Sequence, residues 1–281
     1  MEKGTPSKSQ ETPSAPAHFV TMRTIAPSPP RTRIMPAIVA VIAFAIFQVA
    51  VTILPSIGVG EAIGSQSAAV RTLITPAGWA FSIWGLLYAG AFLFAAYQAL
   101  PAQTDNRLVA RLRWPAAGAF AGNAVWAAYV QFAGLSAVSV VVIIWTLLCV
   151  LTAFSRIAAW GTSYTTGERW CAVVPLSALA AWLTVATTVN IAASLRFHGV
   201  ESGNATPLVS ATIIVVAGAV AGAALLCGRG NPAYAAVILW ALSAIYAAGG
   251  SQADLVAAAA VVAALLVLLG AITGWRRRPG S

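Results

Sequence analysis

Eight long apolar runs follow one another along the chain, and short polar stretches separate them. Each run has about the 20 residues that an α-helix needs to cross a bilayer. The runs cover residues 34–54, 79–100, 114–133, 136–155, 171–194, 206–227, 232–250 and 254–274. This pattern predicts an all-α fold, a polytopic transmembrane helix bundle of about eight spans.

The two ends of the chain differ from these runs. Residues 1–33 combine many Pro, Ser and Thr residues with scattered Lys and Arg, and few large apolar side chains. Such a composition cannot bury a core, so we expect a disordered tail. Residues 276–281 form a short basic segment at the other end.

Composition and charge support a membrane protein. Of the 281 residues, 59% are hydrophobic and 8% are charged, whereas soluble domains carry about 25% charged residues. Fourteen of the 16 Lys and Arg residues lie in the two tails and in the stretches after the second, fourth and sixth runs; Arg71 and Arg196 lie in the alternate stretches. This asymmetry predicts a multi-pass protein of the plasma membrane with both termini cytoplasmic.

The charge distribution also narrows the partners and the chemistry. The net charge of +9 is explained by loops that contact membrane lipid, so we expect no nucleic-acid partner. No charged residue or His lies well inside a predicted span, which argues against an ion-coupled pump and against an ordinary hydrolase. The cysteines, Cys149, Cys171 and Cys227, have no spacing typical of a metal site or disulfide framework.

Three patterns rich in aromatic and amide residues stand above this background. In the last two, spacings of three or four residues place the side chains on one helix face. The first comprises Pro76, Trp79, Phe81, Trp84, Leu87 and Tyr88; the second, Asn123 and Trp126; the third, Trp182, Ala186 and Asn190. Two interpretations are open. The side chains either pack and hydrogen-bond the helices together, or they surround a cavity for a flat hydrophobic ligand.

Small-residue motifs that allow close helix contact recur at Gly118-x-x-x-Gly122, Gly218-x-x-x-Gly222 and Gly270-x-x-x-Gly274. For each of them we expect a contact within the chain more readily than one between chains. The first motif is our candidate for a homodimer contact.

Together the three aromatic patterns resemble the TspO/MBR family, the tryptophan-rich sensory proteins related to the translocator protein or peripheral benzodiazepine receptor. The first pattern matches that family's Pro-Pro-x-Trp-x-Phe-x-x-Trp-x-x-Leu-Tyr signature in order, with Ala77 in place of the second proline. The second and third patterns match motifs of its third and fifth helices. Ala178 and Leu179 stand where the fifth-helix motif normally has Pro-Tyr.

The resemblance covers about residues 34–195 and implies a five-helix bundle around a pocket, with residues 55–78 as its lid. Residues 196–275 then form three additional transmembrane helices, as in a long, divergent form of the family. The implied function is a receptor or carrier for a flat hydrophobic small molecule, first of all a tetrapyrrole such as porphyrin or haem, with a sensory or regulatory role and no required cofactor. The expected ligand-binding residues are Trp79, Phe81, Trp84, Tyr88, Asn123, Trp126, Trp182, Ala186 and Asn190.

Two alternatives to this function stay open. One is a passive transporter or exporter of small hydrophobic molecules that uses all eight spans. The other is a porphyrin-modifying enzyme, which would depend on light or oxygen because the spans hold no acid or base. The first interpretation is not an enzyme, and we assign no catalytic residue.

Overall fold

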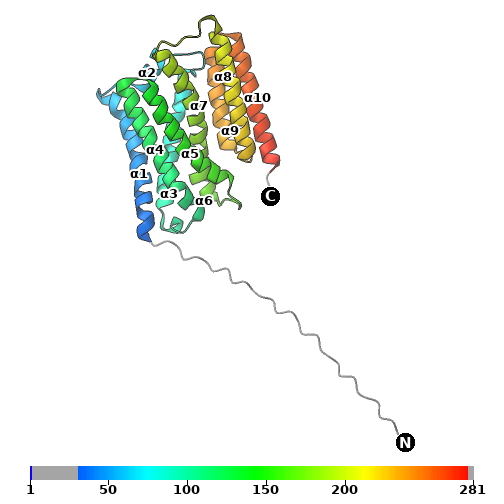
Figure 1. Cartoon of the computed structure of the whole chain (residues 1–281). Helices are drawn as coiled ribbons and strands as arrows, with labels where there is room; N and C mark the ends of the chain where they lie inside the picture. The colour runs from blue at the N-terminus through cyan, green and yellow to red at the C-terminus, as the bar shows by residue number, and fades with distance from the viewer. Residues whose placement is uncertain (2–30, 278–281) are drawn as a thin grey trace.

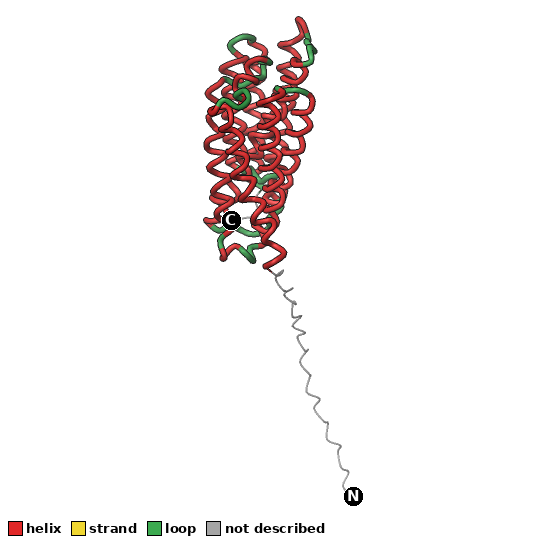
Figure 2. The backbone as a smooth tube through the Cα atoms, turned by 90° about the vertical axis from the view of Figure 1, so that its left-hand side faces the viewer, coloured by secondary structure: helices red, strands yellow, loops and turns green. Residues whose placement is uncertain are grey.

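The computed structural model describes residue 1 and residues 31–277, and these form α-helices, short 3-10 and π turns, and no strand. The long helices run side by side along one axis, with loops at both ends (Figures 1 and 2). The α-helices are α1 (Arg31–Ile53), α2 (Ile63–Ala69), α3 (Ile83–Ala99), α4 (Arg107–Ala133), α5 (Ala137–Ala158), α6 (Thr166–Glu168), α7 (Val174–Phe197), α8 (Thr206–Cys227), α9 (Pro232–Ile245) and α10 (Asp254–Arg276).

Short 3-10 and π turns extend or connect these helices. The 3-10 helix η2 (Gly78–Ser82) leads into α3, and the π turn η4 (Arg169–Val173) joins α6 to α7. A second π turn, η6 (Tyr246–Gly250), continues α9. The bundle is therefore an all-α membrane fold, as the hydropathy pattern predicts.

Among the described residues, seven helical segments are long and apolar enough to cross a membrane, and α4 is the predicted span that falls short of this standard. It is a 27-residue helix, but it packs between α1 and α5 and buries 16 of its residues. The surface of a helix that faces other helices does not need the apolar side chains that lipid demands. The predicted span at 114–133 thus exists as part of α4, with lower hydropathy because much of its surface contacts protein.

The start of α1 and the end of α10 lie at the same end of the bundle (Figure 1). Chain direction then puts the α3–α4, α5–α7 and α8–α9 connections at this end, together with the Arg residues they carry. Arg71 and Arg196 belong to connections at the opposite end. The alternation that the charges predict is therefore present, while the cytoplasmic side and the plasma membrane remain predictions.

One charge from the stretch between the second and third runs lies in the helical core. The hydropathy pattern places residues 101–113 in a loop, but α4 begins at Arg107 because the Asn106 side chain accepts a hydrogen bond from the Val109 N–H at 3.0 Å. Arg113 is consequently in the second turn of α4 and is only 1% exposed. The prediction that residues 101–113 form a loop is wrong from Arg107 onward, and Arg113 is a buried charge next to the predicted third span.

Arg113 is held by neutral acceptors. Its Nε donates to Gln98 Oε1 at 3.0 Å, and its Nη2 donates to the carbonyls of Gln98 and Gln103 at 3.1 and 2.9 Å. Its Nη1 is buried without a hydrogen-bond partner among the described residues. The guanidinium therefore joins α4 to the end of α3 through amide oxygens, without contact to a carboxylate.

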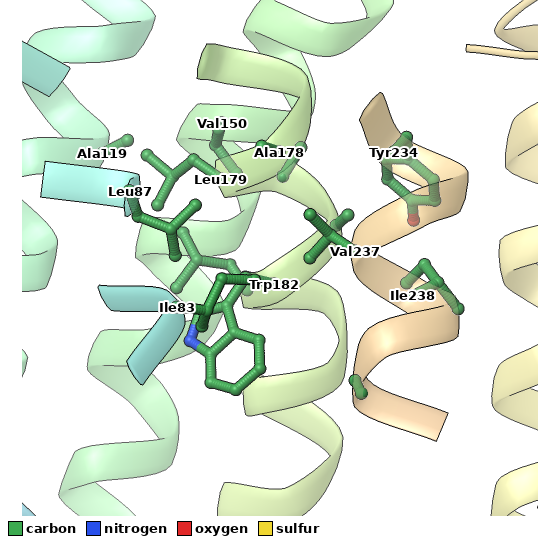
Figure 3. Packing of buried hydrophobic residues seen from close by; sticks show 14 of the residues in the cluster. Ile83, Leu87, Ala119, Val150, Ala178, Leu179, Trp182, Tyr234, Val237 and Ile238 are labelled. Carbon is green, nitrogen blue, oxygen red and sulfur yellow. The ribbon is translucent and has the colours of Figure 1, made fainter. Parts of the chain in front are cut away.

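The last three helices pack against the rest through α9, which lies on α7, while α8 and α10 pack on each other. Buried side chains on α7 face α3, around Ile83 and Leu87, on one side and α9, around Val237 and Ile238, on the other (Figure 3). The predicted boundary between residues 195 and 196 falls inside the last turn of α7. The predicted tail 1–33 lies mostly outside the described residues, with α1 beginning at Arg31, and residues 278–281 also lie outside them.

The glycine motifs make contacts within the chain. A Cβ added to Gly118 would lie 2.8 Å from Cys149 Sγ of α5, and one added to Gly122 would overlap Thr146 of the same helix. Gly218 and Gly222 meet α10 in the same way. The motif chosen for a homodimer is therefore already covered by α5, and dimerisation stays a prediction without an assigned surface.

Candidate functional site

A small cavity lies between α3, α4 and α7, near the end of the bundle that carries α2. Its lining is almost entirely apolar and aromatic. The lining residues are Ile63, Ser67, Pro76, Phe81, Trp84, Trp126, Leu135, Trp182, Val185, Ala186, Val189, Asn190 and Ala193. The cavity measures about 50 Å³, well below the ~300–1,000 Å³ of typical small-molecule pockets. A ligand larger than a few waters requires a wall to move.

Three of the residues that line this cavity are aromatic rings in contact with one another. Phe81 and Trp84 each meet Trp182 edge-on, with ring centroids 6.1 Å apart and interplanar angles of 84° and 83°. Aromatic pairs favour this arrangement because the positive edge of one ring faces the negative face of the other. The Trp182 Nε1–H is buried and has no hydrogen-bond partner in the described part of the chain. The wall therefore offers flat apolar surface and one uncommitted donor.

A hydrogen-bonded cluster also lines the cavity. Trp126 Nε1 donates to Asn190 Oδ1 at 3.2 Å, and Asn190 Nδ2 donates to Ser139 Oγ at 2.8 Å. These bonds join α4, α7 and α5. The Asn190 amide lines the cavity, but its hydrogen bonds hold three helices together. This is the packing role that was one of the two interpretations of its sequence pattern.

Six of the nine predicted ligand residues line the cavity, while Trp79, Tyr88 and Asn123 do not. Trp79 is 48% exposed and packs on Trp240, because it lies in the 3-10 turn η2 and not on the α-helical face of Trp84. Tyr88 stacks behind Trp84 with centroids 5.2 Å apart. Asn123 donates to Gln48 Oε1 at 3.0 Å, between α4 and α1.

Several lining residues were not predicted. Val185, Val189 and Ala193 continue the stripe of Trp182, Ala186 and Asn190 along α7. An extension of the three- and four-residue spacing along the fifth run would have found them.

The predicted lid contributes directly to the cavity. Residues 55–78 contain α2, which supplies Ile63 and Ser67, and they also contain Pro76. No residue of α2 is fully buried, so this short helix is the least tightly packed wall. The side chains of Ile63 and Ser67 carry no signal in the sequence, because α2 is too short for a clear periodicity.

Comparison with known proteins identifies the family of this chain. A family model described as TSPO-like protein matches residues 34–273. The chain belongs to the TSPO-like family. Neither the comparison with curated proteins nor that with solved structures found a match. The resemblance over residues 34–195 implied that α8, α9 and α10 lie beyond the family's region. The family match instead runs through these three helices.

In this TSPO-like protein the two departures from the signature have structural consequences. The Ala77 N–H, which a proline would lack, donates to the Ala244 carbonyl of α9 at 3.0 Å. Ala178 and Leu179 are buried in the apolar core, so the polar contacts of a tyrosine at this place are replaced by packing. The family and the helices establish a multi-pass membrane protein.

Proposed function

We propose that this protein binds a flat hydrophobic ligand of the tetrapyrrole class in the cavity between α3, α4 and α7. The observation that carries the proposal is the edge-on arrangement of Phe81, Trp84 and Trp182 around an apolar space, with the Trp182 Nε1–H uncommitted. Aromatic faces stack on a macrocycle, and a buried donor favours a ligand with an acceptor at its edge.

The cavity size sets a condition on this binding. A macrocycle cannot enter about 50 Å³, so the ligand must displace a wall. The wall with the fewest buried contacts is α2, in which no residue is fully buried. Elements with few buried contacts open at the lowest free-energy cost. We therefore expect α2 to move outward on binding, in the role of a lid.

A titration of the purified protein with protoporphyrin IX tests the proposal. Binding is followed by the porphyrin absorption band and by quenching of tryptophan emission. Ala186→Phe fills the cavity and should weaken the affinity at least tenfold. Ala258→Phe, an equal change at an exposed position of α10, should leave the affinity unchanged. The absence of saturable binding, or equal affinities of the Ala186→Phe variant and the wild type, would refute the proposal.

A second candidate function is passive transport, and one observation favours it. A second apolar cavity of about 30 Å³ lies among α7, α8 and α9, and Val185 and Val189 line both cavities. Ligand movement past these two side chains would use the last three helices. Ile214→Phe, in the second cavity only, should then block porphyrin flux across liposomes and leave binding intact. Equal flux in liposomes with and without the protein would exclude this function.

A further inference from the structure

The segment that precedes α3 is attached to the C-terminal helices. We call residues 72–82 the strap; it comprises the end of the predicted lid and the turn η2. The strap runs antiparallel to α9 and η6, because Leu73 lies beside Gly249, Ala77 beside Ala244, and Ala80 beside Trp240. The contacts on α9 and η6 extend from Trp240 to Gly249, nine residue steps or about 14 Å of helical rise.

Two hydrogen bonds join the strap to α9. The Ala77 N–H donates to the Ala244 carbonyl at 3.0 Å, and Trp240 Nε1 donates to the Ala80 carbonyl at 3.1 Å. Both strap groups belong to the backbone, so the attachment fixes the path of the main chain. A buried backbone group that loses such a partner is costly in an apolar environment.

Packing closes the seam between the strap and α9 at both ends. The Trp79 ring stands edge-on to the Trp240 ring, with centroids 4.7 Å apart and an interplanar angle of 82°. At the other end Gly249 lies so close to the strap that an added Cβ would overlap the Leu73 carbonyl oxygen. Glycine at this position of the π turn η6 allows the two backbones to touch.

The strap's internal hydrogen bonds do not provide this attachment. The Thr75 N–H donates to the Thr72 carbonyl at 3.0 Å, and the Ala80 N–H donates to the Ala77 carbonyl at 2.9 Å. These bonds shape the turns of the strap but do not fasten it to the bundle. The two hydrogen bonds to α9 therefore help to fix its position relative to the cavity.

The strap in turn forms part of the candidate ligand site. Pro76 and Phe81 lie on it and line the cavity, and Trp84 follows one turn later. Helix α9 contributes no lining residue to this cavity in the described structure. It reaches the site indirectly, through the strap and through α7, on which it packs.

We propose that α9 is a positioning element of the ligand site, in which Trp240 and Ala244 hold the strap so that Phe81 meets Trp182. The part of this inference that concerns affinity rests on the proposed function. It assigns a role to the last three helices: they support the aromatic wall from outside. Trp240 and Ala244 are positioning residues, since neither lines the cavity.

Two substitutions remove one hydrogen bond each. Ala77 has φ −57°, close to the value that proline imposes, so Ala77→Pro suits the backbone dihedral. It deletes the N–H donor and places the ring Cδ against the Ala244 carbonyl oxygen, which pushes the strap away from α9. Trp240→Phe keeps an aromatic ring beside Trp79 and deletes the Nε1–H. Trp145→Phe, at a 60% exposed position of α5, is the matched control.

Hydrogen exchange of the ligand-free full chain, read by mass spectrometry on the peptide that covers the strap, tests the attachment. We expect exchange of the strap and of the first turn of α3 to accelerate at least tenfold in Ala77→Pro and in Trp240→Phe. The control should exchange like the wild type. Unchanged exchange in both variants would overturn the inference, whatever the protein binds.

Protoporphyrin IX affinity tests the consequence for the site. Both variants should bind at least fivefold more weakly than the wild type, with the Trp145→Phe control unchanged. Faster exchange with unchanged affinity would overturn the positioning role. If the wild type itself fails to bind, the proposed function and the affinity part of the inference fail together, while the exchange measurement still decides whether α9 holds the strap.

Discussion

The buried arginine of α4 gives the sharpest test of the packing. Arg113 and Gln98 meet at 3.0 Å, and both are 1% exposed or less. Gln98→Leu keeps the side-chain volume but removes an acceptor from a cation that already has one unpartnered nitrogen. A hydrogen bond to a charged group contributes about 1.5–3 kcal/mol, so we expect a loss of that size in the free energy of unfolding.

A second Gln→Leu substitution gives a comparison without a charged partner, although the Gln98 amide also donates to the Ile38 and Ala95 carbonyls. Gln48 is also 1% exposed, and its Oε1 accepts from Asn123 Nδ2 at 3.0 Å. Gln48→Leu therefore removes a hydrogen bond between two neutral side chains. Such interhelical bonds average about 0.6 kcal/mol in a membrane protein, since the unfolded state in the membrane also finds partners. Gln98→Leu should thus be at least twice as destabilising as Gln48→Leu.

Unfolding by SDS in mixed micelles, followed by the loss of helical circular dichroism, measures both free energies under one set of conditions. The double variant Gln98→Leu/Arg113→Met should recover part of the loss, because it removes the buried charge together with its acceptor. Equal effects of the two single Gln→Leu substitutions would refute the reasoning. So would a double variant whose loss is the sum of its parts.

Three further predictions concern the site and the helix contacts. Asn190→Leu leaves Trp126 Nε1 and Ser139 Oγ without a shared partner and should lower the free energy of unfolding by about 1–3 kcal/mol, measured as above. Gly222→Leu places a Cβ 2.8 Å from a carbonyl oxygen of α10 and should cost about 1–3 kcal/mol by overpacking, seen as a lower melting temperature. A maleimide should label Ser67→Cys on α2 more slowly once protoporphyrin IX is bound; an unchanged rate would argue that α2 is not the lid.

The candidate site shows where sequence spacing is informative. On α7 the four-residue spacing of Trp182, Ala186 and Asn190 correctly placed three residues on one cavity wall, because the helix there is regular. Before α3, Trp79 lies away from the cavity, since a 3-10 turn rotates each residue by about 120° and not 100°. Asn123 also lies away from it, because it faces Gln48 of α1.

Arg113 shows the same limit for charge. Its position between a polar stretch and an apolar run is equally consistent with a loop and with a helix. Only the capping of α4 at Asn106 and the oxygen atoms of Gln98 and Gln103 decide that it is buried. A residue's burial depends on neighbours that are distant in the chain, and hydropathy does not contain them.

The sequence by itself determined the class of this protein. In lipid every backbone N–H and C=O must be paired within the chain, so apolar runs of bilayer length form helices whatever their neighbours. The order of these runs and their flanking charges also determined the shared side of the two termini. Both properties belong to single segments and can be read locally.

The tertiary structure alone decided how the segments act together. The hydrogen bond from Ala77 to Ala244 joins residues 167 positions apart, and nothing near either residue signals it. The sequence also does not show which helix each glycine motif contacts, or that the strap is attached to α9. Such contacts depend on which helix faces come together and at what depth, and packing between helices sets both.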